Sequence, residues 1–368
     1  MTVTGWISQL DIIDVQFLVL LGLLAATGIA LAVRTMRRAG RRRWLSTVAA
    51  SLTATLLLLV LVADAVNAHY DYLPTLGDVQ QAVTGDRQWR PVSEVANLDA
   101  HRQRRAALRG LVVKVPMAAD QADGFGRTTN VAYLPPQYFT EPTARFPVVY
   151  LFHGSPGKPE DWFHAGQAAR AGRLLANLEQ PAILIAVQVS RSWTDDSECV
   201  DGAREKVETH VLSQVIPTID ATLRTQADRA GRVFAGMSAG GFCALNLGLR
   251  HRDLVATIVD LSGDTTCTHD GGAPALFGHH TRDAVQRMRA NSPAYYAAVL
   301  SAGPRTRVWL DSGRSDVGIV HQMQALAPVL RSRGLTVQLS TRPGGHTYYV
   351  WTRALRDALP WAIDRSSV

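Results

Sequence analysis

The apolar residues of this chain are unevenly distributed, with two long uncharged runs near the N-terminus and shorter runs further along. The first long run, Val15–Val33, has 19 residues, and the second, Trp44–Ala63, has 20. A helix rises about 1.5 Å per residue, so either run can cross a hydrocarbon core of about 30 Å. One such run is also typical of a buried helix or a signal peptide, but two in succession predict a membrane hairpin. We expect this hairpin to occupy residues 1–66.

The segment that joins the two runs predicts the orientation of the hairpin. Arg34–Arg43 contains six arginines, and short arginine-rich loops remain on the cytoplasmic side of a membrane. The N-terminus and everything after Ala63 should therefore lie outside the cytoplasm. Residues 67–110 show little periodicity apart from an arginine-bearing helical stretch near residues 97–108. We interpret them as a juxtamembrane connector.

From residue 111 to residue 368, short apolar runs alternate with longer amphipathic segments. Leu111–Val115 and Thr128–Leu134 have the alternating pattern of antiparallel edge strands. The other predicted strands are Phe146–Phe152, Ile183–Val189, Arg232–Met237, Thr257–Leu261, Arg307–Leu310 and Thr336–Ser340. Helices are expected at Val207–Leu223, Ala239–Arg250, Gly318–Arg333 and Tyr349–Ile363. Continuous apolar strands separated by helices predict an α/β domain, a mostly parallel sheet covered by helices on both faces.

A G-x-S-x-G pattern surrounds Ser238, from Gly236 to Gly240. The five-residue pattern alone is weak evidence. Here it follows an apolar strand and begins an apolar helix, which is the context of the nucleophile elbow of the α/β-hydrolase fold. The alternative is a glycine-rich turn whose serine only caps a helix. We predict that Ser238 is a catalytic nucleophile.

A serine nucleophile requires a base and an orienting acid, which follow it in the order acid and then histidine in this fold. His346 lies between the last predicted strand and the last predicted helix, so it is the expected base. The acid should follow the preceding strand, where Asp311 and Asp316 compete. We favour Asp316, because its loop can direct the carboxylate toward His346, and we keep Asp311 as the alternative acid.

An oxyanion hole needs two backbone N–H groups close to the nucleophile. Ala239 follows the serine directly and is one expected donor. The loop after the strand ending at Phe152 reads His153-Gly154-Ser155-Pro156-Gly157, and Pro156 has no N–H. We therefore choose Ser155 as the second donor, with a plain turn as the alternative for this loop.

These motifs, in this order, resemble the esterase D family of α/β-hydrolases, which includes the mycobacterial antigen 85 mycolyltransferases, S-formylglutathione hydrolases and feruloyl esterases. The resemblance covers Leu111–Ala362 and rests on the sequences HGSPG, ETHVLSQVIP, GMSAGGFCALNL, a GxxD loop and GGH. It implies acyl-ester chemistry by Ser238, Asp316 and His346, with Ser155 and Ala239 in the oxyanion hole. Glu208 and Thr209 match a recurrent pair of the family. The mycolyltransferases differ in having a glutamate as their acid and no pair of membrane helices.

The charge distribution and the cysteine content limit which partners, cofactors and disulfides are expected. Of the net charge of +7, only +4 lies outside residues 1–66, so a nucleic-acid partner is not indicated. The three cysteines lack metal-site spacing, and we expect neither metal nor cofactor. A Cys199–Cys267 disulfide is compatible with an exported domain, two unrelated thiols being the alternative. We interpret the acidic loop Trp193–Asp201 as a solvated loop, the alternatives being the selection of a cationic group of the substrate and a calcium loop.

The sequence thus predicts a membrane-bound serine esterase that acts outside the cytoplasm on a carboxylic ester, on an envelope lipid or another acylated molecule. Acyl transfer to a sugar or lipid hydroxyl is the alternative activity, because water and alcohols use the same site. A second alternative, from a different class of protein function, is a binding module at the membrane that has no catalytic activity. The substrate and the oligomeric state do not follow from the sequence.

Overall fold

The structure is a computed structural model that describes residues 12, 15–38, 44–70, 76, 100–119, 123–278 and 282–364. The chain divides into two compact units, one formed by residues 1–86 with Thr347–Tyr349 and one by the remaining residues. Residues 39–43 of the arginine-rich loop, and residues 71–75 and 77–99 of the expected connector, lie outside the described part.

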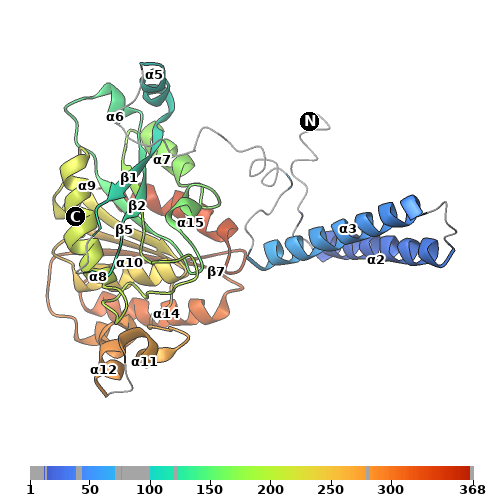
Figure 1. Ribbon diagram of the computed structural model, residues 1–368. Helices are drawn as coiled ribbons and strands as arrows, with labels where there is room; N and C mark the ends of the chain where they lie inside the picture. Colours follow the sequence, from blue (N-terminus) through green and yellow to red (C-terminus); the bar gives the residue numbers. More distant parts are fainter. Residues whose placement is uncertain are drawn as a thin grey trace. The chain divides into compact units, whose positions relative to one another are not determined.

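Two long helices, α2 (Val15–Arg38) and α3 (Trp44–Tyr70), pack side by side as a hairpin (Figure 1). Each is several residues longer than the apolar run from which it was expected. Both contain a segment that is long and apolar enough to cross a membrane, Gln16–Arg34 in α2 and Val48–Ala68 in α3.

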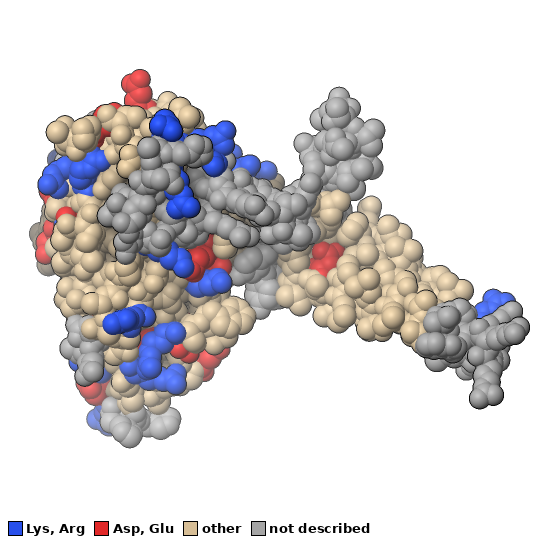
Figure 2. Space-filling view, turned by 45° about the horizontal axis from the view of Figure 1, so that its top comes forward, with Lys and Arg blue, Asp and Glu red and all other residues tan. Residues whose placement is uncertain are grey.

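Small side chains form the contact between α2 and α3, and large apolar side chains point away from it. Ala25, Ala32 and Ala54 are buried, whereas Leu23 and Leu52 are 63% and 65% exposed. Figure 2 shows that the visible face of the hairpin is almost free of charged side chains. A soluble helical pair buries its leucines and exposes polar residues, so this arrangement is the reverse of the usual one.

The second unit contains an eight-stranded sheet of order β1-β2-β4-β3-β5-β6-β7-β8. Only β2 runs against its neighbours, and all other adjacent pairs are parallel. The strands are β1 (Leu111–Met117), β2 (Thr128–Leu134), β3 (Val148–Phe152), β4 (Ile183–Val187), β5 (Arg232–Met237), β6 (Thr257–Leu261), β7 (Arg307–Gly313) and β8 (Thr336–Arg342). The predicted α/β-hydrolase fold is confirmed, although β2 is an inner strand and not an edge strand.

Every residue of β3, β4, β5 and β6 is buried, which explains their continuous apolar sequences. Helices α7 (Ala168–Asn177) and α15 (Tyr348–Ile363) lie on one side of the sheet, and α10 (Ala239–Arg250) and α14 (Val317–Ser332) on the other (Figure 1). The remaining helices are α5 (Ala100–Arg109), α6 (Gln137–Thr140), α8 (Val207–His210), α9 (Ile216–Thr222), α11 (Gly272–Phe277), α12 (Arg282–Ala290) and α13 (Pro293–Tyr296). A wider π-helical turn, Val211–Val215, separates α8 from α9 where one continuous helix was expected.

The expected Cys199–Cys267 disulfide is wrong, because Cys199 is bonded to Cys243. Cys243 lies in α10, which turns it toward the loop that follows β4, with the two Cα atoms 5.3 Å apart. Cys267 is a buried free thiol in a small apolar cluster with Phe242 and Phe277. The bond ties the acidic loop to the helix that begins directly after Ser238.

Candidate active site

Ser238 lies at the sharp turn between β5 and α10, with φ of 55° and ψ of −129°. A residue other than glycine is strained in this conformation, and such strain is concentrated at functional sites. The backbone N–H of Ser238 donates to the carbonyl of Leu261 at the end of β6 (2.9 Å), which holds the turn against the sheet. The geometry is that of a nucleophile elbow.

The glycines of the pattern are required by backbone crowding at this turn. A Cβ atom on Gly236 would lie 1.8 Å from the carbonyl oxygen of Gly240, and one on Gly240 would lie 2.1 Å from the carbonyl oxygen of Phe152. Real Cβ atoms do not approach other atoms this closely. The spacing of the G-x-S-x-G pattern therefore has a local steric cause.

The structure brings His346 and Asp316 together with Ser238. The Nε2 atom of His346 is 2.8 Å from the Ser238 Oγ, and its Nδ1 atom is 2.6 Å from an Asp316 carboxylate oxygen. The His346 ring lies edge-on to Trp351, with 5.0 Å between the ring centroids. The side chain of His346 is 41% exposed, so water or another small acceptor can reach the Ser–His contact from solvent.

Hydrogen bonds between the loops after β7 and β8 determine this arrangement. The Ser315 N–H donates to the carbonyl of Gly344 (2.9 Å), and the Arg314 N–H donates to that of Arg342 (2.8 Å). Asp316 follows as the residue that precedes α14. The acid and the imidazole therefore meet because their two strands are neighbours in the sheet.

Asp311, the alternative acid, does not contact His346. It lies within β7, is fully buried, and accepts two hydrogen bonds from the Arg342 guanidinium (2.8 and 2.5 Å) and one from the Trp309 indole (3.2 Å). Its carboxylate is thus fully engaged in an ion pair with the adjacent strand.

The loop after β3 lies against the nucleophile, since a Cβ atom on Gly154 would be 3.3 Å from the Ser238 Cβ. Within the described residues, no hydrogen bond occupies the backbone N–H of Ser155 or of Ala239, the two expected oxyanion donors. His153 supports this loop, a role that the sequence reading missed. Burial lowers the pKa of His153 to about 4, so its ring is neutral. Its Nδ1–H donates to the Gly154 carbonyl (2.8 Å), and its Nε2 accepts from the Val189 N–H (3.5 Å).

The acidic loop Trp193–Asp201 is joined to the loop after β3. The Gly157 N–H donates to the Trp193 carbonyl (2.7 Å), and the Ser155 hydroxyl donates to the Asp195 carbonyl (3.3 Å). Glu198 is buried and accepts from the Thr268 N–H (2.6 Å). Burial, together with the charge of Asp196, raises the pKa of Glu198 to about 8. The interior part of the loop is therefore packed and not solvated.

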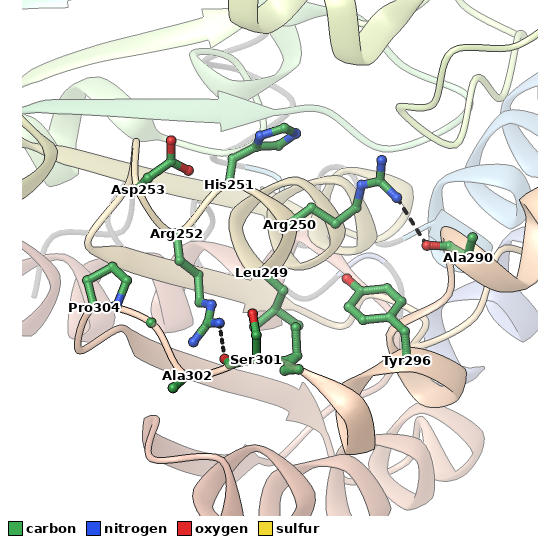
Figure 3. A pocket seen from close by; sticks show the side chains of 12 residues that line it. Leu249, Arg250, His251, Arg252, Asp253, Ala290, Tyr296, Ser301, Ala302 and Pro304 are labelled. Atoms are coloured by element: carbon green, nitrogen blue, oxygen red, sulfur yellow. Dashed lines mark hydrogen bonds between the residues drawn. The ribbon is translucent and has the colours of Figure 1, made fainter.

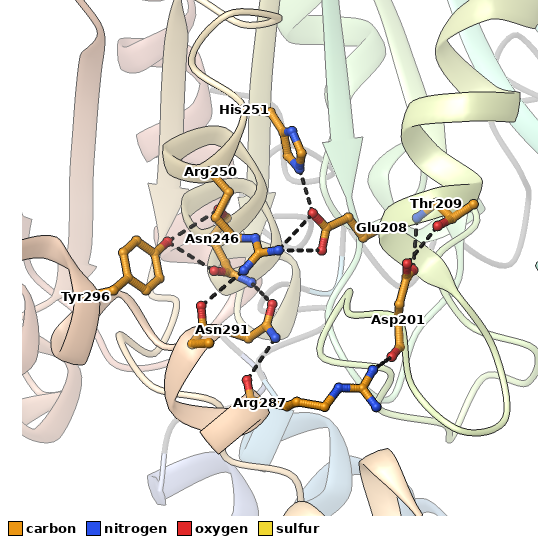
Figure 4. Close-up of polar contacts among 10 residues, drawn as sticks. Asp201, Glu208, Thr209, Asn246, Arg250, His251, Arg287, Asn291 and Tyr296 are labelled. Carbon is orange, nitrogen blue, oxygen red and sulfur yellow. Dashed lines mark hydrogen bonds and ion pairs between the residues drawn. The ribbon is translucent and has the colours of Figure 1, made fainter. Parts of the chain in front are cut away.

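Other clusters singled out by sequence lie away from this centre. A hollow at the opposite end of α10, lined by residues 249–253 and 300–304 among others, contains none of the residues of the Ser238 site (Figure 3). In α8, Glu208 bonds to Arg250 and His251 at the end of α10, and Thr209 bonds to Asp201 (Figure 4). Glu208 and Thr209 therefore connect α8 to other segments of the domain. Across the described residues, no three His, Cys, Asp or Glu side chains are grouped so that they could hold a metal ion.

Comparisons with known proteins identify the family and the fold of this chain. Residues 124–362 match the protein family described as Putative esterase. An uncharacterized protein of Corynebacterium glutamicum is 28% identical over 348 residues, which cover 90% of this chain and 78% of that protein. An esterase of Mycobacterium tuberculosis is 28% identical over 157 residues, 41% of this chain and 33% of that protein. A solved ferulic acid esterase superposes with a TM-score of 0.59 at 22% identity, covering 69% of this chain and 98% of its own.

Proposed function

Because the chain belongs to the Putative esterase family and is a carboxylic-ester hydrolase, we propose that it cleaves its ester through an acyl-enzyme on Ser238. The observation that carries the proposal is the continuous hydrogen-bonded series from Ser238 through His346 to Asp316, at 2.8 and 2.6 Å. A serine hydroxyl becomes a useful nucleophile only beside such a base.

In the first step, the Ser238 Oγ attacks the ester carbonyl carbon and its proton passes to His346 Nε2. Asp316 accepts from the Nδ1–H, which fixes the tautomer and stabilises the imidazolium. The negative charge that develops on the carbonyl oxygen is bound by the N–H groups of Ala239 and Ser155, with the positive end of α10 behind it.

The tetrahedral intermediate then collapses. The bond to the alcohol oxygen breaks, and the alcohol leaves with the proton from His346. A water molecule next attacks the acyl-enzyme and gives its proton to His346, and the carboxylic acid departs as Ser238 recovers its proton. An alcohol can replace this water, because the site is open to solvent, so acyl transfer to a hydroxyl is the second candidate activity.

A fluorophosphonate probe tests the nucleophile. The wild-type protein should be labelled, the Ser238→Ala variant should not, and Ser315→Ala is the matched control because Ser315 is an exposed serine of the acid loop. Equal labelling of wild type and Ser238→Ala would exclude Ser238, and no labelling of either would favour a non-catalytic module. Acyl transfer is distinguished from hydrolysis by adding a sugar or lipid alcohol to the assay and identifying the products by mass spectrometry. Transfer gives the acylated alcohol, and hydrolysis gives the free acid.

We further propose that α2 and α3 span the cell membrane, with the hydrolase domain outside the cytoplasm. The support is the inverted packing of the hairpin, since helices in lipid associate through small residues and present large apolar ones to the acyl chains. The Cys199–Cys243 disulfide points to an oxidising compartment, and the arginines of residues 34–43 point to a cytoplasmic loop. A reporter that is active only outside the cytoplasm should work after His69 and fail after Arg38. The opposite result would place the hydrolase inside the cell.

The tether favours an ester that is presented at the outer membrane face, on an envelope lipid or another acylated molecule. A bound enzyme gains effective concentration toward such substrates without any new contact. A protein starting near Ala100 should keep its rate on a small soluble ester but act more slowly on native membranes than the full chain. Equal rates on membranes would indicate a soluble substrate.

A further inference from the structure

Arginine residues gather where the parallel strands begin, at the sheet edge opposite Ser238. Arg232 and Arg307 are the first residues of β5 and β7, and Arg229, Arg252 and Arg305 precede β5, β6 and β7 by a few residues. Several of these guanidinium groups bond to backbone carbonyls, which carry no full negative charge. Arg307 donates to the carbonyls of Trp361 and Asp364, and Arg229 donates to those of Arg252 and Arg305.

Arg252 is the member of this group that also lines a hollow. It is 8% exposed, and its guanidinium donates to the Ser301 carbonyl (2.6 Å). In the described part of the chain, no carboxylate lies within ion-pair distance of Arg252 or of Arg229. Burial and then the charge of Arg252 lower the pKa of Arg229, whereas the charge of Asp253 partly opposes this by raising it. A buried charge without a counter-ion is unfavourable and favours the binding of an anion.

Arg252 lines a hollow of about 470 Å³ (Figure 3). Its neighbours Arg250 and His251 both bond to the carboxylate of Glu208, so Arg250 already has a counter-ion (Figure 4). Asp253 lines the same hollow but remains beyond ion-pair distance from the guanidinium groups. The apolar part of the lining comprises Leu249, Ala290, Tyr296, Leu300, Ala302 and Pro304, and polar atoms contribute about as much of the surface.

We propose that this hollow binds the phosphate group of a phosphate-bearing molecule, with Arg252 as its counter-ion. A planar guanidinium matches the geometry of a phosphate, and the apolar walls can cover the carbon atoms next to it. The phosphate comes either from a soluble compound or from an anionic lipid headgroup. This site is separate from Ser238 and does not depend on the esterase mechanism.

Titration calorimetry of the full chain in zwitterionic lipid nanodiscs tests the site, with inorganic phosphate as the probe and chloride at matched ionic strength as the reference. Saturable phosphate binding is expected. Because Arg252→Gln alters a buried group and its fold is at risk, the decisive variant is Ala302→Glu, which adds a carboxylate on an exposed residue of the rim. Its affinity should fall about tenfold, or about 1.4 kcal/mol. Ala298→Glu, an exposed neighbour that does not line the hollow, should bind like wild type, and so should Ser238→Ala.

The source of the phosphate is tested by changing the lipid. If nanodiscs that contain phosphatidylglycerol weaken the binding of added phosphate, a lipid headgroup occupies the hollow, and if they do not, the ligand is soluble. The proposal is overturned if wild type shows no saturable binding beyond the chloride reference. It is overturned equally if Ala302→Glu and Ala298→Glu bind phosphate with the same affinity as wild type.

Discussion

Exchanging the two neighbouring carboxylates, one at a time, for amides should separate catalysis from stability. Asp316 contacts the imidazole of His346 (2.6 Å) and is partly exposed, whereas Asp311 is fully buried and pairs with Arg342. Asp316→Asn removes the charge that orients and stabilises the imidazolium and leaves the core intact. Asp311→Asn removes the charge that balances a guanidinium in the protein interior.

The two magnitudes follow from these contacts. Loss of the triad carboxylate should lower kcat about 10³- to 10⁴-fold, because the amide favours the wrong histidine tautomer. Removing one partner of a buried ion pair costs about 3–5 kcal/mol of unfolding free energy. The lower end applies to Asp311→Asn, since Arg342 is 14% exposed and retains Asp357 at 3.0 Å. Asp316→Asn should change the stability by less than about 1 kcal/mol, as at other partly exposed sites.

Both variants are compared with wild type by denaturant unfolding and by kcat on a soluble ester, measured under conditions where each is folded. Asp316→Asn should be stable and nearly inactive, and Asp311→Asn should be destabilised and retain much of its kcat. Asp316 is not the catalytic acid if the folded Asp311→Asn protein has the severe loss of kcat while Asp316→Asn remains active.

Three further predictions concern the scaffold of the site. Replacing Cys199 and Cys243 by serine should lower the unfolding free energy by about 2–4 kcal/mol, because the bond closes a loop between residues 44 positions apart. Denaturation with and without a reductant measures this, and a reductant without effect on wild type would contradict it. Burial raises the pKa of Asp260 to about 8, so the folded state holds its proton more tightly than the unfolded chain does. Stability should therefore fall as the pH rises from about 4 to about 8, and a Tm series should show a smaller fall for Asp260→Asn; an unchanged series would contradict it. Gly240→Ala should abolish fluorophosphonate labelling, because its Cβ would lie 2.1 Å from the Phe152 carbonyl oxygen, and full labelling would show that the turn can relax.

The parts of the fold that the sequence predicts well depend on local patterns. Strands that are buried on both faces need continuous apolar runs, and the crowded turn at Ser238 needs glycine at positions 236 and 240. Both requirements can be recognised from a few consecutive residues of the sequence. His346 and Asp316 could be proposed because each follows a recognisable strand. The family match and the structural neighbours support the same fold.

The features that the sequence does not predict arise from contacts between distant segments. The partner of Cys199 depends on which side of α10 faces the loop after β4, and the apolar pattern of that helix is the same on every side because nearly all of α10 is buried. The neutral state of His153 depends on its burial beneath loops that come from β3 and β4. Neither property has a signal in the neighbouring residues.

The choice between Asp311 and Asp316 illustrates how the position at which one strand ends affects the interpretation of a site. The apolar run ends at Leu310, which predicts Asp311 at the end of the strand and Asp316 in the loop, but β7 continues to Gly313 by pairing with β8. Asp311 is therefore a strand residue whose direction is determined by the sheet, and its carboxylate meets Arg342 of the next strand. Asp316 lies beyond the last paired residue, where the two loops approach each other, and only there can a carboxylate reach the imidazole of His346. The pairing of polar strand ends, which apolar periodicity does not report, thus decides which aspartate contacts the histidine.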